Sequence, residues 1–272
     1  MVILNPRRSL EVPVYADCIS PDIFAERFRK EISALNLWEG NRQRLLGDLF
    51  NIQDEDVDNP VETTVQLKGD LRKVRMIGAK MSMGKIIIEG DVGMHLGAMM
   101  KGGEILVKGN VDSWLGCMME GGRIEVTGSA ADYVGAPHRG STDGMKDGTI
   151  AIHGNAGNEV GCYMRGGLIR MDGNVGEFAG IHMRDGTILV QGDCEGRAGA
   201  GMVDGKVIIC GYVPSVLPTF TIDDIRPNVK IDGEKVTGPF YRFTGDSAEN
   251  GKGRLFVSKN ANAHLGFFER YL

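Results

Sequence analysis

The sequence predicts an all-β protein: a right-handed parallel β-helix of about seven 19-residue turns, with a helical N-terminal segment and a non-repeating C-terminal tail. Three observations predict this fold, namely an excess of glycine, a repeat of fixed length and an alternating apolar pattern inside each repeat. The 272 residues include 40 glycines, about twice the usual share of ~7%. Only nine prolines accompany them, so the glycines indicate a regular backbone with evenly spaced turns.

Four columns of residues recur with one period. Neighbours in a column are 19 residues apart, except for a single step of 26 in each column. Three columns are glycine and begin at Gly78, Gly84 and Gly90. The fourth column is entirely methionine and consists of Met81, Met100, Met119, Met145, Met164, Met183 and Met202. The repeat unit is therefore 19 residues long, and one unit carries a seven-residue insertion at 137–143.

Each unit contains a short strand pattern. Apolar residues alternate with other residues between two glycines, as at Ile86 and Ile88 or Ile105 and Val107, and this period of two is typical of a strand with one face inside. A 19-residue unit is too short for a strand–helix–strand motif or a four-stranded propeller blade. It suits one turn of a parallel β-helix, about 4.8 Å from the next, and the crossover preference makes the coil right-handed.

The methionine column is expected to be a structural core column inside the coil. Thioethers bind Cu(I), but an identical side chain in every turn is typical of a stacked interior ladder that fills irregular apolar space. The insertion carries His138 and Arg139. Insertions in such a coil form loops, so we expect these two residues to lie either on a plain surface loop or in a contact with a partner.

The chain divides into three parts. Residues 1–62 do not repeat. Ser20 and Pro21 resemble a helix start, apolar residues follow at helical spacing, and an acidic stretch at 54–60 reads as a linker, so this part is expected to be a helical cap or docking segment. Residues 63–213 are the parallel β-helix. Residues 214–272 contain strand patterns around Asp232 and Gly233 and an aromatic end, and form a C-terminal tail and cap.

Composition excludes several classes of protein. A net charge of −5 argues against a nucleic-acid partner, which would need a basic face. No apolar run has the ~20 residues of a membrane helix, and the N-terminus lacks the pattern of a signal peptide, so we expect no membrane partner and a cytoplasmic location. Five cysteines without a Cys-x-x-Cys pair fit a reducing compartment.

The sequence shows no catalytic, cofactor-binding or metal-binding constellation. Cys117 and Cys162 share one position of the unit but lie two turns apart, too far for a disulfide or a shared metal. His95, His153 and His182 occupy different columns, so we expect no His-x-His motif and no ladder of histidines. The Gly-x-Gly strings precede strand patterns instead of a helix, which argues against a dinucleotide-binding loop.

The repeat resembles two related families. Gly-x-x-Gly-x-x-x-Gly strings, as at 90–97, 154–161 and 173–180, resemble the C-terminal β-helix domain of glutamate synthase. The unit Gly-x-x-Met-x-x-Gly-x-[Ile/Val]-x-[Ile/Val]-x-Gly is more specific. It resembles the repeat of the C subunit of formylmethanofuran dehydrogenase, of tungsten or molybdenum type, and occurs at 78–90, 97–109, 116–128, 180–192 and 199–211. Met171 replaces the last apolar residue of one further unit, and the insertion breaks another.

The second resemblance implies a structural scaffold subunit of an oxidoreductase complex that reversibly reduces CO₂ and forms N-formylmethanofuran in methanogenesis, a branch of one-carbon metabolism. It implies a hetero-oligomer in which other subunits hold the tungsto- or molybdopterin, the iron–sulfur clusters and the two-metal site of an amidohydrolase-like subunit. This chain would itself be non-catalytic and hold no cofactor. Two alternatives remain open: the C subunit of a methylotroph formyltransferase/hydrolase complex, and a stand-alone glutamate synthase-type domain.

Overall fold

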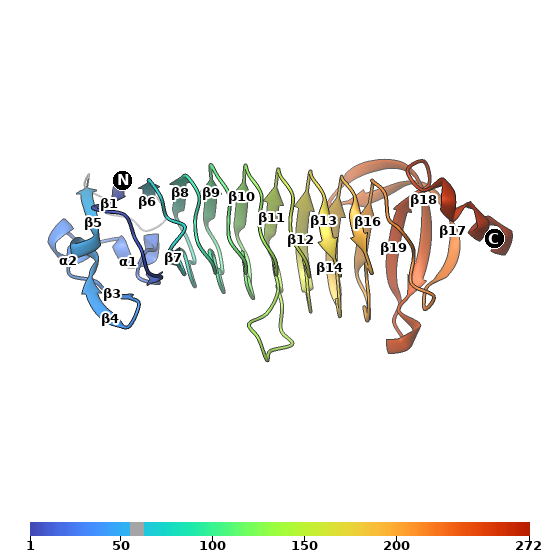
Figure 1. The fold of residues 1–272 in the computed structure, drawn as a ribbon, viewed down its shortest axis with the longest axis horizontal. Helices are drawn as coiled ribbons and strands as arrows, with labels where there is room; N and C mark the ends of the chain where they lie inside the picture. The colour runs from blue at the N-terminus through green and yellow to red at the C-terminus, as the bar shows by residue number, and fades with distance from the viewer. Residues whose placement is uncertain (55–62) are drawn as a thin grey trace.

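The protein is an elongated stack of strands with a small structured segment at each end (Figure 1). The computed structural model describes residues 1–54 and 63–272. The two termini lie at opposite ends of the long axis (Figure 1). Most of the predicted acidic linker at 54–60 lies outside the described residues.

Strands dominate the described residues, so the predicted all-β class is confirmed. The strands are β1 Val2–Pro6, β2 Val14–Tyr15, β3 Asn36–Glu39, β4 Arg42–Leu45, β5 Phe50–Asp54, β6 Thr64–Lys68, β7 Val74–Arg75, β8 Lys85–Glu89, β9 Glu104–Val107, β10 Arg123–Val126, β11 Thr149–Ile152, β12 Arg165–Met171, β13 Val175–Glu177, β14 Asp185–Val190, β15 Cys194–Gly196, β16 Lys206–Ile209, β17 Thr221–Ile231, β18 Glu234–Gly245 and β19 Gly253–Ser258. The α-helices are α1 Pro21–Phe24, α2 Arg29–Ser33 and α3 Leu46–Leu49, and the 3₁₀ helices are η1 Ser247–Glu249 and η2 Ala263–Tyr271.

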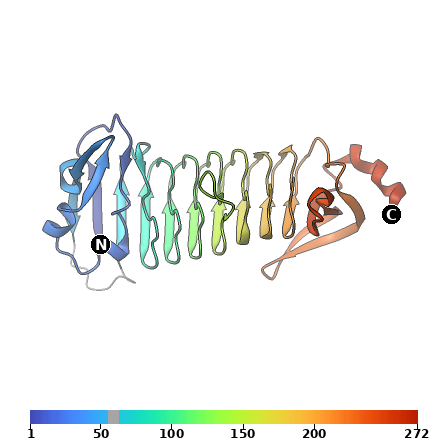
Figure 2. The same cartoon turned by 90° about the horizontal axis from the view of Figure 1, so that it is seen from below.

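The repeat units stack through parallel strands, and one strand of each unit belongs to a continuous row along the long axis (Figure 2). Residues at one position of successive units face each other, so that Ile86 pairs with Ile105 and Ile105 with Ile124. The long step changes nothing in this register, because Ile124 pairs with Ile150 across the insertion. The extra residues instead form a loop that projects from the row of strands between β10 and β11 (Figure 1).

Two further apolar columns line the interior. The predicted column after the second glycine forms parallel bridges, as from Val92 to Val111, and continues in the pairing of β13 with β15. The other column, which comes just before the third glycine, was not predicted from the sequence. Its members are at most 7% exposed: Ile77, Leu96, Leu115, Val134, Val160, Ala179 and Ala198. The core is therefore continuous along the stack.

The methionine column and one glycine column are physically coupled. All seven methionine side chains of the column have 0% exposure. A Cβ atom added to Gly148 would lie only 2.8 Å from the Cε methyl of Met119. A Cβ atom added to Gly122 would lie equally close to the Cε methyl of Met100. Each methionine thus fills the space that the glycine of the next unit leaves empty. Gly148 also has a φ of +94°, a conformation that L-residues rarely adopt.

The N-terminal segment differs from the expected helical one, because strands outnumber helices in it. The apolar pattern after Pro21 forms two short helices, α1 and α2, because Glu26 has a left-handed φ of 59° that ends the helical path between them. Strand β1 pairs parallel with β6 and antiparallel with β5, so it extends the stack and covers its end.

The C-terminal tail closes the other end. β17 and β18 form the predicted hairpin around Asp232 and Gly233, and β19 then adds a parallel strand to β16. The hairpin packs on the outer face of the last units, where Leu189 and Ile208 join a second apolar cluster beneath it. This cluster was not predicted from the sequence. Leu189 and Ile208 are apolar residues at outward positions of their units, and this pattern indicates that something covers them.

Candidate functional site

The insertion folds back onto the stack and packs against aromatic side chains. His138 is half-buried, and its ring centroid lies 5.2 Å from that of His95. Arg139 is exposed, with its guanidinium carbon 5.6 Å from the ring centroid of Trp114. We call the group of His95, Trp114, Tyr133, His138 and Arg139 the aromatic corner. Both residues predicted as a partner contact therefore belong to a structured surface.

The repeat itself stacks the rings of this corner. His95, Trp114 and Tyr133 hold the same position in three successive units and share a left-handed φ of 62°, 63° and 67°. An equal backbone conformation at equal spacing projects the three side chains in parallel. Their ring centroids are consequently 5.3 Å and 4.5 Å apart, within the usual range for stacked aromatic pairs.

A cysteine thiol completes a cluster that sequence reasoning missed. Ligand atoms of His95, Cys117 and His138 all lie within 4.8 Å of one another. His153 and His182 do not belong to this cluster, and no sequence pattern had linked His95 with Cys117 and His138. A column contains residues at one position of the unit, whereas this cluster joins different positions, and the return path of the insertion has no periodic signal.

Burial dominates the electrostatics of this cluster. It lowers the pKa of His95 to about 4, with further lowering by His138, so the imidazole is neutral at pH 7. Burial also raises the pKa of Cys117 to about 12. Nδ1 of His95 is a buried nitrogen without a hydrogen-bond partner in the described part of the chain. A hollow of about 240 Å³ adjoins the corner on the side of Tyr163.

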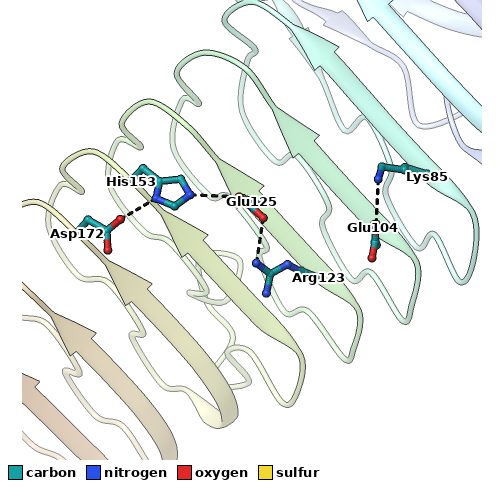
Figure 3. Close-up of polar contacts among 6 residues, drawn as sticks. All are labelled: Lys85, Glu104, Arg123, Glu125, His153 and Asp172. Atoms are coloured by element: carbon teal, nitrogen blue, oxygen red, sulfur yellow. Dashed lines mark hydrogen bonds and ion pairs between the residues drawn. The ribbon is translucent and has the colours of Figure 1, made fainter. Parts of the chain in front are cut away.

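A second candidate surface is the outward face of β8 to β12, where charges of opposite sign alternate between units (Figure 3). Lys85 lies 3.2 Å from Glu104. His153 lies 2.6 Å from Asp172 and 3.2 Å from Glu125, on opposite ring nitrogens. Hydrogen bonds to Asp172 and then Glu125 raise the pKa of His153. These pairs stabilise neighbouring strands in the manner of cross-strand ion pairs.

The hairpin turns part of this face into a groove of about 390 Å³. Arg123, Arg170 and Asp172 line its floor, and Asp232 and Glu234 at the hairpin tip line its wall. The lining carries both signs of charge and offers a polar surface for a partner. It contains no cysteine or serine that would act as a nucleophile.

Both ends of the molecule expose large apolar side chains. At the N-terminal end Phe28 is 76% and Trp38 50% exposed. At the C-terminal end Phe267 is 51% and Tyr271 62% exposed. Phe24 and Ile32, from the apolar pattern that includes Phe28, are buried within the segment itself.

Four of the five cysteines are buried, and Cys210 is half-buried under the hairpin. Burial raises the pKa of Cys194 to about 11, so its thiol is protonated at neutral pH. Among the described residues, no helix has both the length and the apolar character needed to cross a membrane.

Comparison with known proteins finds similarity to subunits of two kinds of enzyme complex. No family model matches the chain. The C subunit of molybdenum-containing formylmethanofuran dehydrogenase 1 from Methanosarcina barkeri is 38% identical over 95 residues, which cover 35% of this chain and 32% of the relative. The C subunit of tungsten-containing formylmethanofuran dehydrogenase 2 from Methanothermobacter wolfeii is 40% identical over 95 residues, 35% of each protein. The chain thus spans about a third of the length of these curated relatives.

A solved structure matches over nearly the whole chain. It is a chain of the formyltransferase/hydrolase complex FhcABCD from Methylorubrum extorquens, a structure in complex with methylofuran. The match has 30% identity and a TM-score of 0.82, and covers 94% of this chain and 99% of that one. The chain belongs to the same family as this chain of the formyltransferase/hydrolase complex, and part of it is similar to the C subunits of formylmethanofuran dehydrogenases. Within this family, the sequence resemblance drawn from the Gly-x-x-Met repeat is confirmed.

Proposed function

We propose that the chain is the structural scaffold subunit of a formylmethanofuran dehydrogenase complex in the cytoplasm. That complex would reversibly reduce CO₂ and form N-formylmethanofuran in methanogenesis. The observation that carries the proposal is the identity of 38% and 40%, over 95 residues, to C subunits of the molybdenum and the tungsten enzymes. The repeat region, with its methionine column, supports the same assignment.

The scaffold would consist of a right-handed parallel β-helix over residues 63–213, an N-terminal docking segment over 1–62 and a C-terminal cap over 214–272. The register supports the coil, because each strand pairs in parallel with the strand one unit later. The methionine column would act only as its packed core. A continuous apolar interior makes such a coil stiff, which suits a subunit that holds others at fixed positions.

Other subunits would perform the chemistry. The partners in this proposal are a pterin-binding subunit with tungsten or molybdenum, an amidohydrolase-like subunit with two metals, and iron–sulfur subunits. Iron–sulfur clusters need four thiolates close together. Cys18, Cys117, Cys162, Cys194 and Cys210 instead lie in different parts of the fold, which supports a non-catalytic role for this chain.

A second candidate is the corresponding subunit of a formyltransferase/hydrolase complex. The structural match favours it, because the chain covers 99% of the neighbour from Methylorubrum extorquens at 30% identity. This complex would transfer and hydrolyse formyl groups without the reductive step. The two candidates share the scaffold role and differ in the redox subunits that accompany it.

Purification of the tagged chain with its native partners separates the two candidates. A dehydrogenase complex should contain molybdenum or tungsten together with iron, and should reduce a viologen dye with formylmethanofuran as the donor. A complex with formyl transfer but without these metals would select the second candidate. Recovery of the chain alone from cells that contain either activity would refute both.

Point variants test the docking role more cleanly than a deletion. Removal of residues 1–60 would also remove β1 and expose β6 as a sheet edge, so loss of assembly would have two causes. We therefore propose Phe28→Ser and Phe267→Ser, with Val203→Ser as a matched control, since Val203 is 41% exposed on the stack itself. The two end variants should fold normally and lose partners in co-purification, while the control keeps them. Full assembly of both end variants would contradict docking through the ends.

A further inference from the structure

The structure brings together two imidazoles and a thiol that no function proposed above uses. We propose that His95 and His138 of the aromatic corner, together with the neighbouring Cys117, bind one Zn²⁺ ion. The ligand atoms already lie within 4.8 Å of one another. A tetrahedral zinc site, with Zn–N of about 2.0–2.1 Å and Zn–S of about 2.3 Å, places its ligand atoms roughly 3.3–3.6 Å apart. The ligand atoms need to approach one another by at most about 1.2–1.5 Å to reach that geometry.

The ligand set selects the ion. Two imidazoles and one thiolate form a borderline-soft donor set, which suits Zn²⁺ and disfavours Mg²⁺ and Ca²⁺, whose ligands are oxygen atoms. Three protein ligands leave the fourth position to a water molecule. Solvent reaches the site at the loop, where His138 is half-buried and the neighbouring Arg139 is exposed.

An unsatisfied nitrogen provides an independent observation. Nδ1 of His95 is buried and lacks a hydrogen-bond partner among the residues that the structure describes. A buried polar atom without a partner costs roughly 1–3 kcal/mol, and such atoms are rare in folded proteins. Coordination to a metal would satisfy the nitrogen that protein groups leave without a partner.

The placement of the three ligands explains what the ion would do. His95 and Cys117 lie in adjacent layers of the stack, since the N–H of Met99 donates to the carbonyl of Cys117, and His138 lies in the insertion one layer further on. The ion would therefore fasten the loop to the stack and cross-link three successive units. Without the insertion, the third ligand would be missing, which gives the seven extra residues a structural role.

The test uses the purified full-length chain, freed of metal by a chelator and titrated with Co²⁺ as a spectroscopic probe and then with Zn²⁺. The variants are Cys117→Ala and His138→Ala. The matched controls are Cys162→Ala, which removes a buried thiol from the same position of a unit two repeats later, and His153→Ala, which removes an imidazole outside the cluster. Circular dichroism verifies the fold of every variant.

Wild type and both controls should bind one Co²⁺ per chain, with the visible bands of a tetrahedral ion and a thiolate charge-transfer band, and Zn²⁺ should displace it. Loss of an outer-shell partner alone weakens metal binding about 10–100-fold, so loss of a ligand should weaken it at least about 100-fold. The charge-transfer band should disappear in Cys117→Ala. Should Cys117→Ala fail to fold, His138→Ala in the surface loop still decides the matter. Wild type without a thiolate–Co²⁺ band, or a folded His138→Ala that binds like wild type, would overturn the proposal.

Discussion

Substitution of Met119 by alanine measures how much the methionine column contributes to stability. Met119 has 0% exposure, and the change removes three buried heavy atoms, Cγ, Sδ and Cε. At about 0.8 kcal/mol per buried methylene-sized group, the lost transfer free energy is roughly 2.4 kcal/mol. A cavity adds to this cost, because Gly148, against which the Met119 Cε packs, has no side chain to fill the space. Recovered side-chain entropy offsets part of it, so we expect a loss of about 2–4 kcal/mol.

The assay is equilibrium unfolding in urea, followed by far-ultraviolet circular dichroism. Met83→Ala is the matched control, since Met83 is 36% exposed, and its cost should stay near about 0.5 kcal/mol. The denaturant slope must be equal in both variants and wild type, because a repeat protein that unfolds in parts would invalidate a single free energy. A Met119→Ala cost below about 1 kcal/mol at unchanged slope would refute the packing argument.

Three further predictions concern the units, the charged face and the C-terminal cap. Gly109→Ala should lower the free energy of unfolding in urea by several kcal/mol, because the added Cβ would lie 2.4 Å from a carbonyl oxygen of the preceding unit. Gly233 has open space around it, so Gly233→Ala should cost only the ~1–2 kcal/mol that an L-residue loses in a left-handed conformation. His153→Gln should lower the free energy of unfolding by a few tenths of a kcal/mol at about pH 6, because only the imidazolium pairs with both carboxylates. The loss should shrink as the pH rises through the raised pKa of His153, and an equal loss at about pH 9 would contradict this. Asn262→Ala should cost about 2–4 kcal/mol, because the buried amide accepts from one backbone N–H at 2.8 Å and donates to two carbonyls at 2.8 and 2.9 Å; a melting temperature equal to wild type would exclude that role.

Repetition determined what the sequence could predict. The strand at Ile86 and Ile88 was predictable because the same alternation recurs in each unit, and the inward direction followed from its period of two. The column of Leu96 was missed because it varies between leucine, isoleucine, valine and alanine, and so has no single residue type to align.

Contacts between segments far apart in the chain were not predictable in this way. β1 pairs with β6 about 60 residues later, and neither strand belongs to a glycine column, so nothing local indicates the pairing. The cluster of His95, Cys117 and His138 joins different positions of the unit, and its third member comes from the one segment that breaks the period. Periodicity specifies the stack, whereas the ends and the loop depend on long-range packing.

Because the register is unbroken across the insertion, the length of the stack depends only on the number of complete units. Ile124 faces Ile150 although seven extra residues separate their units, so added residues leave the stack as a loop unless they number a complete unit. A duplicated unit would instead match every interior column and move the two end segments apart by about 4.8 Å. The number of units therefore determines the separation between the two end segments, and this distance can change in equal increments while the surfaces of both ends stay the same.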